Sequence, residues 1–321
     1  MKSKPLVWLS PLVLLMAVLA GLAFGPGGFG LFVSPEIASI RLPRVLLGAL
    51  VGMGLAVSGA ALQAVLGNAL AEPYLLGVSG GAACGTALAL ILGLSSGLAG
   101  VFTMQFFSFF FGVAAIFLVY RLARVHGRLP SETMILSGVV VNAFFSGLIM
   151  LLMSLAGRQL QDMIYILMGN LGILFTRDTV FLLAMASVLV MAGSIYLWIQ
   201  SKNLNLLTLG EAPAQSMGVP VERLKKTVFF IIALMVAALV SLAGVIGFIG
   251  LMVPHLGRML SGPDNKRLLP VSGLLGASLL ILSDTLARSF GNFEIPVGVI
   301  TALLGVPFFI FLLWRKKSQK I

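Results

Sequence analysis

Long, nearly uncharged stretches of apolar residues recur along the whole chain. Six of them suit one helix each: residues 6–24, 45–66, 133–157, 179–201, 268–287 and 295–314. An α-helix rises about 1.5 Å per residue, so about 20 apolar residues cross the hydrocarbon core of a membrane. The pattern predicts an all-α polytopic membrane protein. The first stretch resembles the apolar part of a signal peptide, but it is too long for one and predicts a retained helix.

Two further apolar stretches are longer than one ordinary span. Residues 73–120 carry no charge and predict two helices, with a break at 93–97 where Gly and Ser gather. Residues 227–257 fit either one long helix or two short ones. A split at residues 243–244 gives ten spans, an even number that returns the basic carboxyl end to the side of the amino end. Residues 163–176 are apolar but too short to span, so they predict an interfacial or re-entrant segment.

The Lys and Arg residues support this topology, with both termini in the cytoplasm. The chain has 21 Lys and Arg against ten Asp and Glu, a formal net charge of +11. Ten spans leave sixteen of the 21 on the cytoplasmic side, as membrane proteins prefer. The five on the outer side are Arg41, Arg44, Arg158, Arg177 and Arg288. The positive charge is therefore explained by topology, and we expect no nucleic acid partner.

The composition excludes an ordinary soluble enzyme. Hydrophobic residues make up 59% of the chain and charged residues 10%, whereas soluble domains carry about 25% charged residues. We expect one transmembrane domain over residues 1–321. Glycines four apart, such as Gly48 with Gly52 and Gly81 with Gly85, predict close helix contacts. The single cysteine, Cys84, excludes an internal disulfide and is expected to pack within a helix.

Sequence motifs for catalysis are absent. The chain contains no phosphate-binding loop, no His-Glu-x-x-His and no Gly-x-Ser-x-Gly. We therefore expect no enzymatic activity, no cofactor and no metal site, since only two histidines occur, His126 and His255, far apart in the sequence. Asp284 is the only acidic residue well inside a predicted span. Its place four residues before Arg288 predicts a local ion pair rather than an ion-transport site, so energy for transport would come from another polypeptide.

The segment of about residues 202–226 is the only sizeable cytoplasmic loop. Its Gly and Pro residues predict short helical pieces. As a solvated connector it would expose apolar side chains without reason; these are Leu206, Leu207, Leu209, Met217 and Val219. We favour a docking surface for a cytosolic partner.

Several motifs, in order, carry a family resemblance. In the amino half they are Arg41-Leu42-Pro43-Arg44, Ser58-Gly59 with Gln63, Asn68 to Pro73, and Leu76 to Ala82. In the carboxyl half they are Gly247 to Leu251, Pro254-His255 with Arg258, Gly262-Pro263-Asp264, Leu269-Pro270, Gly276-Ala277, Asp284 to Arg288, Glu294 to Val299, and Gly305-x-Pro307-Phe308. Through them residues 40–314 resemble the FecCD-type permease subunits of ATP-binding-cassette importers for ferric siderophores, haem and cobalamin. Ala69 departs from the family, which usually has proline there, and this affects only local loop geometry.

The resemblance implies a type II importer permease fold of ten helices in the bacterial cytoplasmic (inner) membrane. It also implies a homodimer with the translocation path at its two-fold axis, two cytosolic ATP-binding-cassette ATPase subunits, and a periplasmic or surface-anchored substrate-binding protein. The partner ATPases would switch the path between outward and inward access. The permease itself would not be catalytic.

The resemblance also implies roles for particular residues. The coupling helices that dock into the ATPases would include Leu209, Gly210, Glu211, Ala212 and Gly218. Docking of the binding protein would use Arg41, Arg44 and Arg288, although interfacial arginines can also contact phospholipid headgroups. Ser131 and Glu132 align weakly with a cytoplasmic gate. The alternative for Ser131 is a helix N-cap.

The sequence leaves the transported chelate open among siderophore, haem and cobalamin. Two other classes of protein compete with an importer permease. An ion-gradient-driven secondary transporter is disfavoured by the lack of membrane-buried carboxylates. A membrane assembly protein without transport activity would show no substrate-dependent stimulation of an ATPase.

Overall fold

The computed structural model is nearly all helical. It describes residues 5–25, 28–29, 35–94, 100–172, 176–289 and 294–318. The α-helices are α1 Leu9–Ala23, α2 Pro35–Leu66, α3 Val78–Ile91, α4 Gly100–Ala123, α5 Ser131–Leu155, α6 Leu160–Leu167, α7 Arg177–Ile199, α8 Ser201–Leu207, α9 Glu211–Ser216, α10 Val221–Ala243, α11 Ile249–Ser261, α12 Asn265–Ala287 and α13 Val297–Ser318. The 3-10 helices are η1 Pro5–Trp8, η2 Pro73–Leu76 and η3 Gly157–Gln159, and the strands β1 Phe24–Gly25 and β2 Gly28–Phe29 pair antiparallel.

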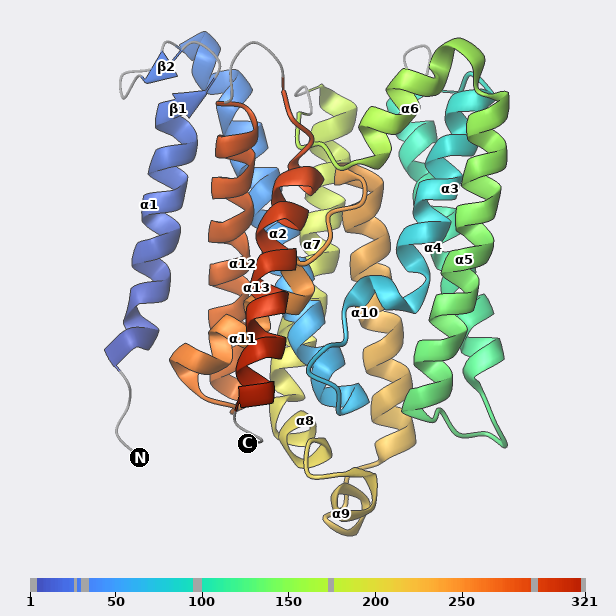
Figure 1. The fold of residues 1–321 in the computed structure, drawn as a ribbon, viewed down its shortest axis with the longest axis vertical. Coiled ribbons are helices and arrows are strands. Elements are labelled where there is room, and N and C mark those ends of the chain that lie inside the picture. The colour runs from blue at the N-terminus through green and yellow to red at the C-terminus, as the bar shows by residue number, and fades with distance from the viewer. Residues whose placement is uncertain are drawn as a thin grey trace.

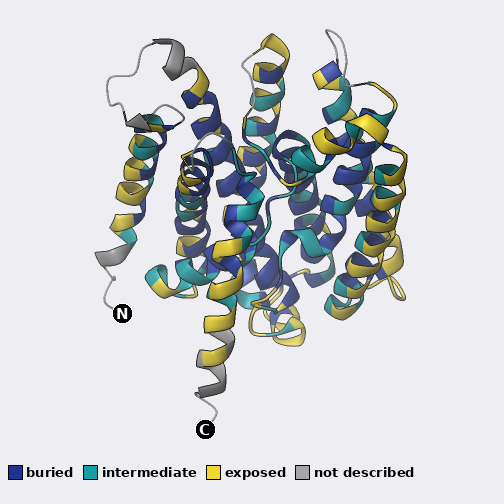
Figure 2. Ribbon diagram, turned by 45° about the horizontal axis from the view of Figure 1, so that its top comes forward, coloured by how far each residue is buried: buried dark blue, intermediate teal, exposed yellow. Residues whose placement is uncertain are grey.

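Helix α2 runs through the centre of the bundle and packs against α12, α10 and α11 (Figure 1). Its apolar span is 83% buried, against 22% for the spans of α5 and α7, and Figure 2 shows the buried residues concentrated in the middle of the molecule. Glycine permits the closest approach, because a Cβ on Gly52 would lie 2.2 Å from the carbonyl oxygen of Gly276 in α12. The backbone of α4 similarly leaves no space for a side chain on Gly81 or Gly85 of α3. The predicted packing role of the spaced glycines is confirmed.

Each of the ten predicted spans contains a helix. Among the residues that the structure describes, six helices, α2, α4, α5, α7, α10 and α12, are long and apolar enough to cross a membrane, while α1, α3 and α13 contain shorter apolar helical stretches. The predicted interfacial segment, 163–176, overlaps the end of α6, which has only eight residues. Residues 168–172 are not helical, and 173–175 lie outside the described residues. Helix α1 begins and α13 ends at the end of the bundle where α8 and α9 lie, which we call the α9 end (Figure 1). This arrangement suits an even number of crossings, and the number ten stays a prediction.

The prediction for the start of the second span was wrong by ten residues. Helix α2 begins at Pro35 and not at residue 45, so Arg41, Pro43 and Arg44 lie inside the helix rather than before it. Two physical reasons account for the difference. Neighbouring helices compensate for the backbone hydrogen bond that a proline removes from a membrane helix. Arg41 is also bonded to a carbonyl oxygen of α1 and Arg44 to Glu294, so these charges are offset and do not end the helix.

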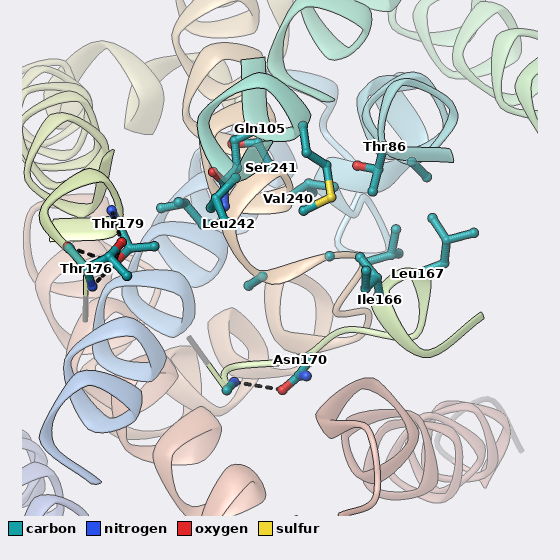
Figure 3. Close-up of a pocket in the computed structure, with 17 residues that line it drawn as sticks. Thr86, Gln105, Ile166, Leu167, Asn170, Thr176, Thr179, Val240, Ser241 and Leu242 are labelled. Atoms are coloured by element: carbon teal, nitrogen blue, oxygen red, sulfur yellow. Dashed lines mark hydrogen bonds between the residues drawn. The ribbon is translucent and has the colours of Figure 1, made fainter. Parts of the chain in front are cut away.

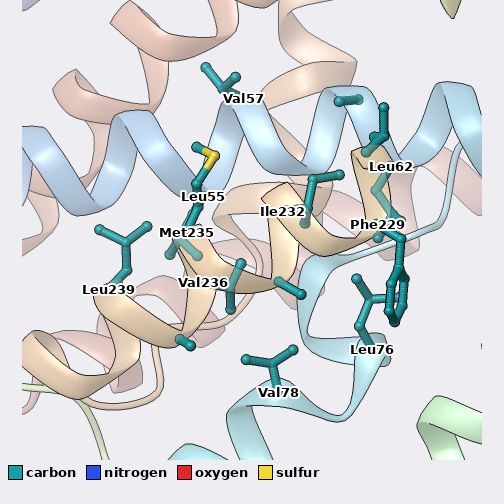
Figure 4. Packing of buried hydrophobic residues seen from close by; sticks show 14 of the residues in the cluster. Leu55, Val57, Leu62, Leu76, Val78, Phe229, Ile232, Met235, Val236 and Leu239 are labelled. Carbon is teal, nitrogen blue, oxygen red and sulfur yellow. The ribbon is translucent and has the colours of Figure 1, made fainter. Parts of the chain in front are cut away.

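The apolar stretch 227–257 divides at the predicted place. Helix α10 ends at Ala243, residues 244–248 are not helical, and α11 begins at Ile249. Gly244 has φ +71°, and a Cβ there would lie 2.3 Å from the carbonyl oxygen of Ile166, so glycine is required. Below this break, α10 packs its apolar face on α2 and η2 (Figure 4); the labelled residues include Leu55, Leu62, Leu76, Phe229, Ile232 and Met235.

Candidate functional site

Five charged side chains meet at the end of the bundle opposite the α9 end. We call Arg41, Arg44, Asp284, Arg288 and Glu294 the charge cluster. Arg44 donates two hydrogen bonds to Glu294, at 2.8 and 2.9 Å, and its Nε lies 3.6 Å from an Asp284 oxygen. The Nε of Arg288 lies 3.3 Å from the other Asp284 oxygen, which confirms the predicted local ion pair. Asp284 is therefore shared between two arginines from different helices.

Backbone carbonyls of α1 complete the charge cluster. Arg41 Nη1 donates to the carbonyl oxygens of Leu22 and Ala23, at 2.8 and 2.9 Å, and Arg288 Nη2 donates to that of Gly21. Arg41, Arg44 and Arg288 are only 5%, 8% and 2% exposed. The cluster thus ties α1, α2, α12 and the segment before α13 together.

Glu294 is the most accessible member of the cluster, with 37% of its side chain exposed. It lies just before α13, outside the helical spans. The hydrogen bond from Arg44 lowers the pKa of the Glu294 carboxyl below its ordinary value. Glu294 therefore holds Arg44 as an ionised partner at neutral pH.

At the α9 end, α8 and α9 form a compact corner that projects beyond the bundle (Figure 1). Gly210 and Gly218, which flank α9, have φ +117° and +85°, values that favour glycine. Leu209 and Met217 are exposed, as a docking surface would require. Leu207 and Val219 are buried, so that part of the expected exposed apolar surface was wrong. These two side chains instead hold the corner onto the bundle.

A buried lysine fixes α9 to the transmembrane part of the chain. Lys225, in the second turn of α10, has no exposed side-chain surface, and its Nζ lies 2.7 Å from Oε1 of Glu211, the first residue of α9. The Glu211 side chain is half exposed. Glu222, in the first turn of α10, accepts a hydrogen bond from the backbone N–H of Leu129 at 2.9 Å. The start of α10 is therefore bonded to two of the four cytoplasmic connections of the predicted topology.

Polar side chains connect two interruptions between the long helices, segment 67–77, which includes the 3-10 helix η2, and segment 244–248. Glu72 accepts a hydrogen bond from the N–H of Phe248 at 2.6 Å, and the hydroxyl of Tyr74 accepts one from the N–H of Ile246 at 2.9 Å. Gln63 donates to the Ala71 carbonyl oxygen at 3.2 Å. Unpaired backbone groups at membrane depth are costly, so these bonds permit the helices to be interrupted there.

Phe248 itself has φ +69°, an uncommon value for an aromatic residue. Its ring lies against Gly305 of α13, where a Cβ would approach within 2.3 Å. Glu72, Phe248 and Gly305 thus form a continuous contact from segment 67–77 to α13.

The polar interactions of these sites are mainly ion pairs and hydrogen bonds between side chains and backbone groups. Within the ranges that the structure describes, no three His, Cys, Asp or Glu side chains gather closely enough to hold a metal ion.

Comparison with known protein families identifies the class to which the chain belongs. The model of the FecCD transport family matches residues 11–315. The chain belongs to the FecCD transport family.

Relatives of this FecCD chain include permeases that are named for different cargoes. The cobalamin import system permease protein BtuC of Halobacterium salinarum is 40% identical over 285 residues, 89% of this chain and 75% of the relative. The hemin transport system permease protein HmuU of Yersinia pestis is 38% identical over 88% of this chain and 84% of its own length. The molybdate import system permease protein MolB of Haemophilus influenzae is 36% identical over 88% and 81%.

A solved structure shares the fold of the FecCD chain. It is an inward-facing transporter assigned to the metal-chelate type of ATP-binding-cassette transporters, with a TM-score of 0.85 and 32% identity over 96% of this chain and 98% of that one. The chain therefore has the type II importer permease fold. It is a multi-pass permease of an ATP-binding-cassette importer in the inner membrane, a class of subunit that works with an ATPase and a substrate-binding protein and is not itself an enzyme.

The residues predicted as a cytoplasmic gate, Ser131 and Glu132, lie at the start of α5 of this FecCD chain. Ser131 is the first residue of that helix, while Pro130 precedes it and no side chain caps it, so the N-cap alternative for Ser131 was wrong. Thr133 bridges the turn instead, with its hydroxyl 3.0 Å from the Ala123 carbonyl oxygen. Glu132 is exposed in the first turn, a favourable place for a negative charge. A gating role for Ser131 and Glu132 stays a prediction.

Sequence reasoning missed the partners that the FecCD fold brings together over long separations. Glu72 and Glu294 both lie inside the quoted motifs, but their partners Phe248 and Arg44 are 176 and 250 residues away. Lys225 was counted only as a topological charge. Its place on a mostly apolar helix face was a signal of burial, but nothing local indicated Glu211 as its partner.

Proposed function

We propose that the chain is the permease subunit of an importer that moves a metal chelate across the inner membrane, using ATP that a partner subunit hydrolyses. The observation that carries this proposal is the family match over residues 11–315 together with the structural likeness over 96% of the chain. The names of the cobalamin and hemin relatives favour a cobalamin or haem cargo, and the sequence motifs keep a ferric siderophore as a further candidate. The molybdate relative makes an oxyanion the competing cargo.

The corner at the α9 end is the proposed ATPase docking site. Leu209, Glu211, Ala212 and Gly218 are exposed there, and Gly210 is partly so. The Glu211–Lys225 ion pair would carry a displacement of α9 into α10, because it joins the corner to a buried point of the bundle. Helix α10 leads directly to the break at 244–248, which supports a mechanical connection to the middle of the molecule.

The charge cluster is the proposed docking site for the binding protein. Arg44 suits this role best, since its partner Glu294 is 37% exposed and an incoming carboxylate can take its place on the guanidinium. Arg41 and Arg288 are bound to carbonyl groups of α1, so their participation requires a shift of α1.

The full assembly in this proposal contains two copies of the permease, two cytosolic ATPase subunits and one binding protein, with the translocation path between the permeases. Each copy crosses the membrane ten times and keeps both termini in the cytoplasm. The position of the α1 start and the α13 end beside α8 and α9 supports that topology (Figure 1).

Reconstitution tests the proposal. The permease, its ATPase and its binding protein are placed in proteoliposomes, and uptake is measured for a ferric siderophore, haem, cobalamin and molybdate. We expect uptake of one chelate that requires both ATP on the ATPase side and the binding protein. The absorption spectrum of the loaded binding protein identifies that chelate independently. Uptake driven by an ion gradient without the partner proteins would overturn the proposal in favour of a secondary transporter.

A further inference from the structure

A cavity of about 310 Å³ lies between α3, α4, α6, α7 and the end of α10. We call it the amide cavity, because the side chain of Gln105 from α4 forms part of its wall beside Ser241 (Figure 3). Its other polar lining residues are Thr86, Asn170, Thr176 and Thr179. The described lining residues carry no formal charge. A volume of this size falls at the lower end of the range for ligand pockets.

The polar groups of the amide cavity include an unsatisfied acceptor. Gln105 is only 5% exposed, and its Oε1 is buried without a hydrogen-bond partner among the described residues. The two nearby hydroxyls cannot supply one, because Ser241 donates its hydrogen to the Ala238 carbonyl oxygen at 2.8 Å and Thr86 donates its own to that of Ala82 at 3.1 Å. A buried polar atom without a partner costs about 1–3 kcal/mol. The cavity is therefore suited to a ligand that brings hydrogen-bond donors.

A second cavity, of about 350 Å³, continues from the first between α4 and α7. We call it the α4–α7 groove. It shares Gln105, Ser241 and Leu242 with the amide cavity, and its remaining lining is apolar. Phe102, Phe106 and Met185 on its walls are 42%, 55% and 55% exposed, so the groove opens on the outside of the chain.

The depth of the two cavities fits an amphiphile in the membrane. The amide cavity lies beside the first turn of α7 and the end of α10, on the side away from the α9 end. Gln105 is five residues from the start of α4, a rise of about 7–8 Å. On α4 the groove is lined by residues 102–109, so it begins beside Gln105 and reaches four residues, about 6 Å, beyond it into the apolar part of the bundle. A ligand with a polar group and an attached hydrocarbon chain would place the polar group in the amide cavity and the chain in the α4–α7 groove.

We propose that the amide cavity and the α4–α7 groove together bind one phospholipid of the outer leaflet. Its acyl chain lies in the groove, and a donor of its headgroup, an ammonium N–H or a hydroxyl, bonds to Gln105 Oε1. Water alone could satisfy Gln105, but it would not fill an apolar groove. This site is distinct from the charge cluster and from the corner at the α9 end. It requires that the chain lies in a membrane, and its assignment to the outer leaflet rests on the proposed topology.

Headgroup chemistry gives a direct test. Phosphatidylethanolamine has ammonium N–H donors, whereas the quaternary ammonium of phosphatidylcholine has none. The purified, delipidated permease assembly is titrated with each lipid, and bound lipids are counted by native mass spectrometry. We expect one tightly held phosphatidylethanolamine per chain and at least tenfold weaker retention of phosphatidylcholine. Equal retention of the two lipids, or no retained lipid, would overturn the proposal, and this comparison needs no variant.

Variants test whether the bound lipid occupies the amide cavity and the α4–α7 groove. Gln105→Leu should remove the preference between the two lipids, and Ala186→Phe, which fills the groove, should weaken both. The matched controls are Gln161→Leu and Ala184→Phe, at exposed positions outside both cavities, and they should bind like the wild type. A preference that survives in Gln105→Leu would place the lipid elsewhere. A transport defect without any change in lipid retention would likewise contradict the lipid site, while leaving the importer proposal intact.

Discussion

At the scale of single residues, the charges of the cluster and of Lys225 are tolerated because ion pairs or backbone carbonyl groups offset them. Asp284 illustrates how far sequence reasoning extends. Its pairing with Arg288 was predictable, since residues four apart on a helix are neighbours. Its contact with Arg44 and the bond between Arg44 and Glu294 were not predictable, because the packing of α2 against α12 and the segment before α13 brings these partners together.

Replacing Asp284 should damage the charge cluster more than any other single neutral substitution there. In Asp284→Asn, two buried guanidinium groups lose their shared carboxylate, and removing one partner of a buried pair costs about 3–5 kcal/mol. Thermal unfolding of the purified chain in detergent should reveal the loss. Asp178→Asn, at an exposed carboxylate, is the control and should change stability by less than about 0.5 kcal/mol. Similar stability of the two variants would show that the cluster does not stabilise the fold.

The Glu211–Lys225 pair should respond unequally to removal of its two members. Glu211→Gln leaves a fully buried ammonium without a carboxylate, and we expect a loss of about 3 kcal/mol. Lys225→Met removes the buried charge and leaves a half-exposed carboxylate that water can solvate, so stability should stay near that of the wild type. The same unfolding measurement applies. If the double variant is no more stable than Glu211→Gln alone, the cost does not arise from the stranded lysine.

At the scale of elements, the lengths of the apolar stretches predicted where the helices lie, and the need for an even number of spans predicted the break after Ala243. The sequence did not reveal that segment 67–77 supports that break through Glu72 and Tyr74. Nor did it reveal the early start of α2, because Arg41 and Arg44 resembled the polar end of a span. Both misses have one cause. Length and hydropathy describe a helix in lipid, whereas these features depend on partners elsewhere in the chain.

Gly218 offers a test of the corner at the α9 end. Its φ of +85° disfavours any L-residue, most of all a β-branched one, although a Cβ there would meet no other atom within 4 Å. Gly218→Val should therefore distort the corner while the bundle stays intact, and it should abolish ATPase stimulation by the binding protein in the reconstituted importer. Gly218→Asn, which tolerates this backbone conformation better, should retain most of it. Equal ATPase stimulation in both variants would show that the corner at the α9 end does not take part in coupling.

At the scale of the whole molecule, the topology can be tested with the protein almost as it stands. Cys84 is the only cysteine and is 3% exposed, so the wild type should give little background with a membrane-impermeant maleimide. Each cysteine introduced at a chosen position then reports on which side of the membrane that position lies. Ser216→Cys in α9 and Ser318→Cys at the end of α13 mark the α9 end, and Gln161→Cys in α6 marks the opposite end.

The distribution of basic residues decides the expected labelling. Sixteen of the 21 Lys and Arg residues fall on the side of the α9 end in the ten-span topology, and such an excess orients a membrane protein with that side in the cytoplasm. In intact cells with a permeabilised outer envelope, Gln161→Cys should be labelled, while Ser216→Cys and Ser318→Cys should react only after the inner membrane is opened. Labelling of Ser318→Cys but not Ser216→Cys from outside would mean an odd number of crossings between them. Labelling of both would invert the molecule and place the ATPase corner on the side without ATP.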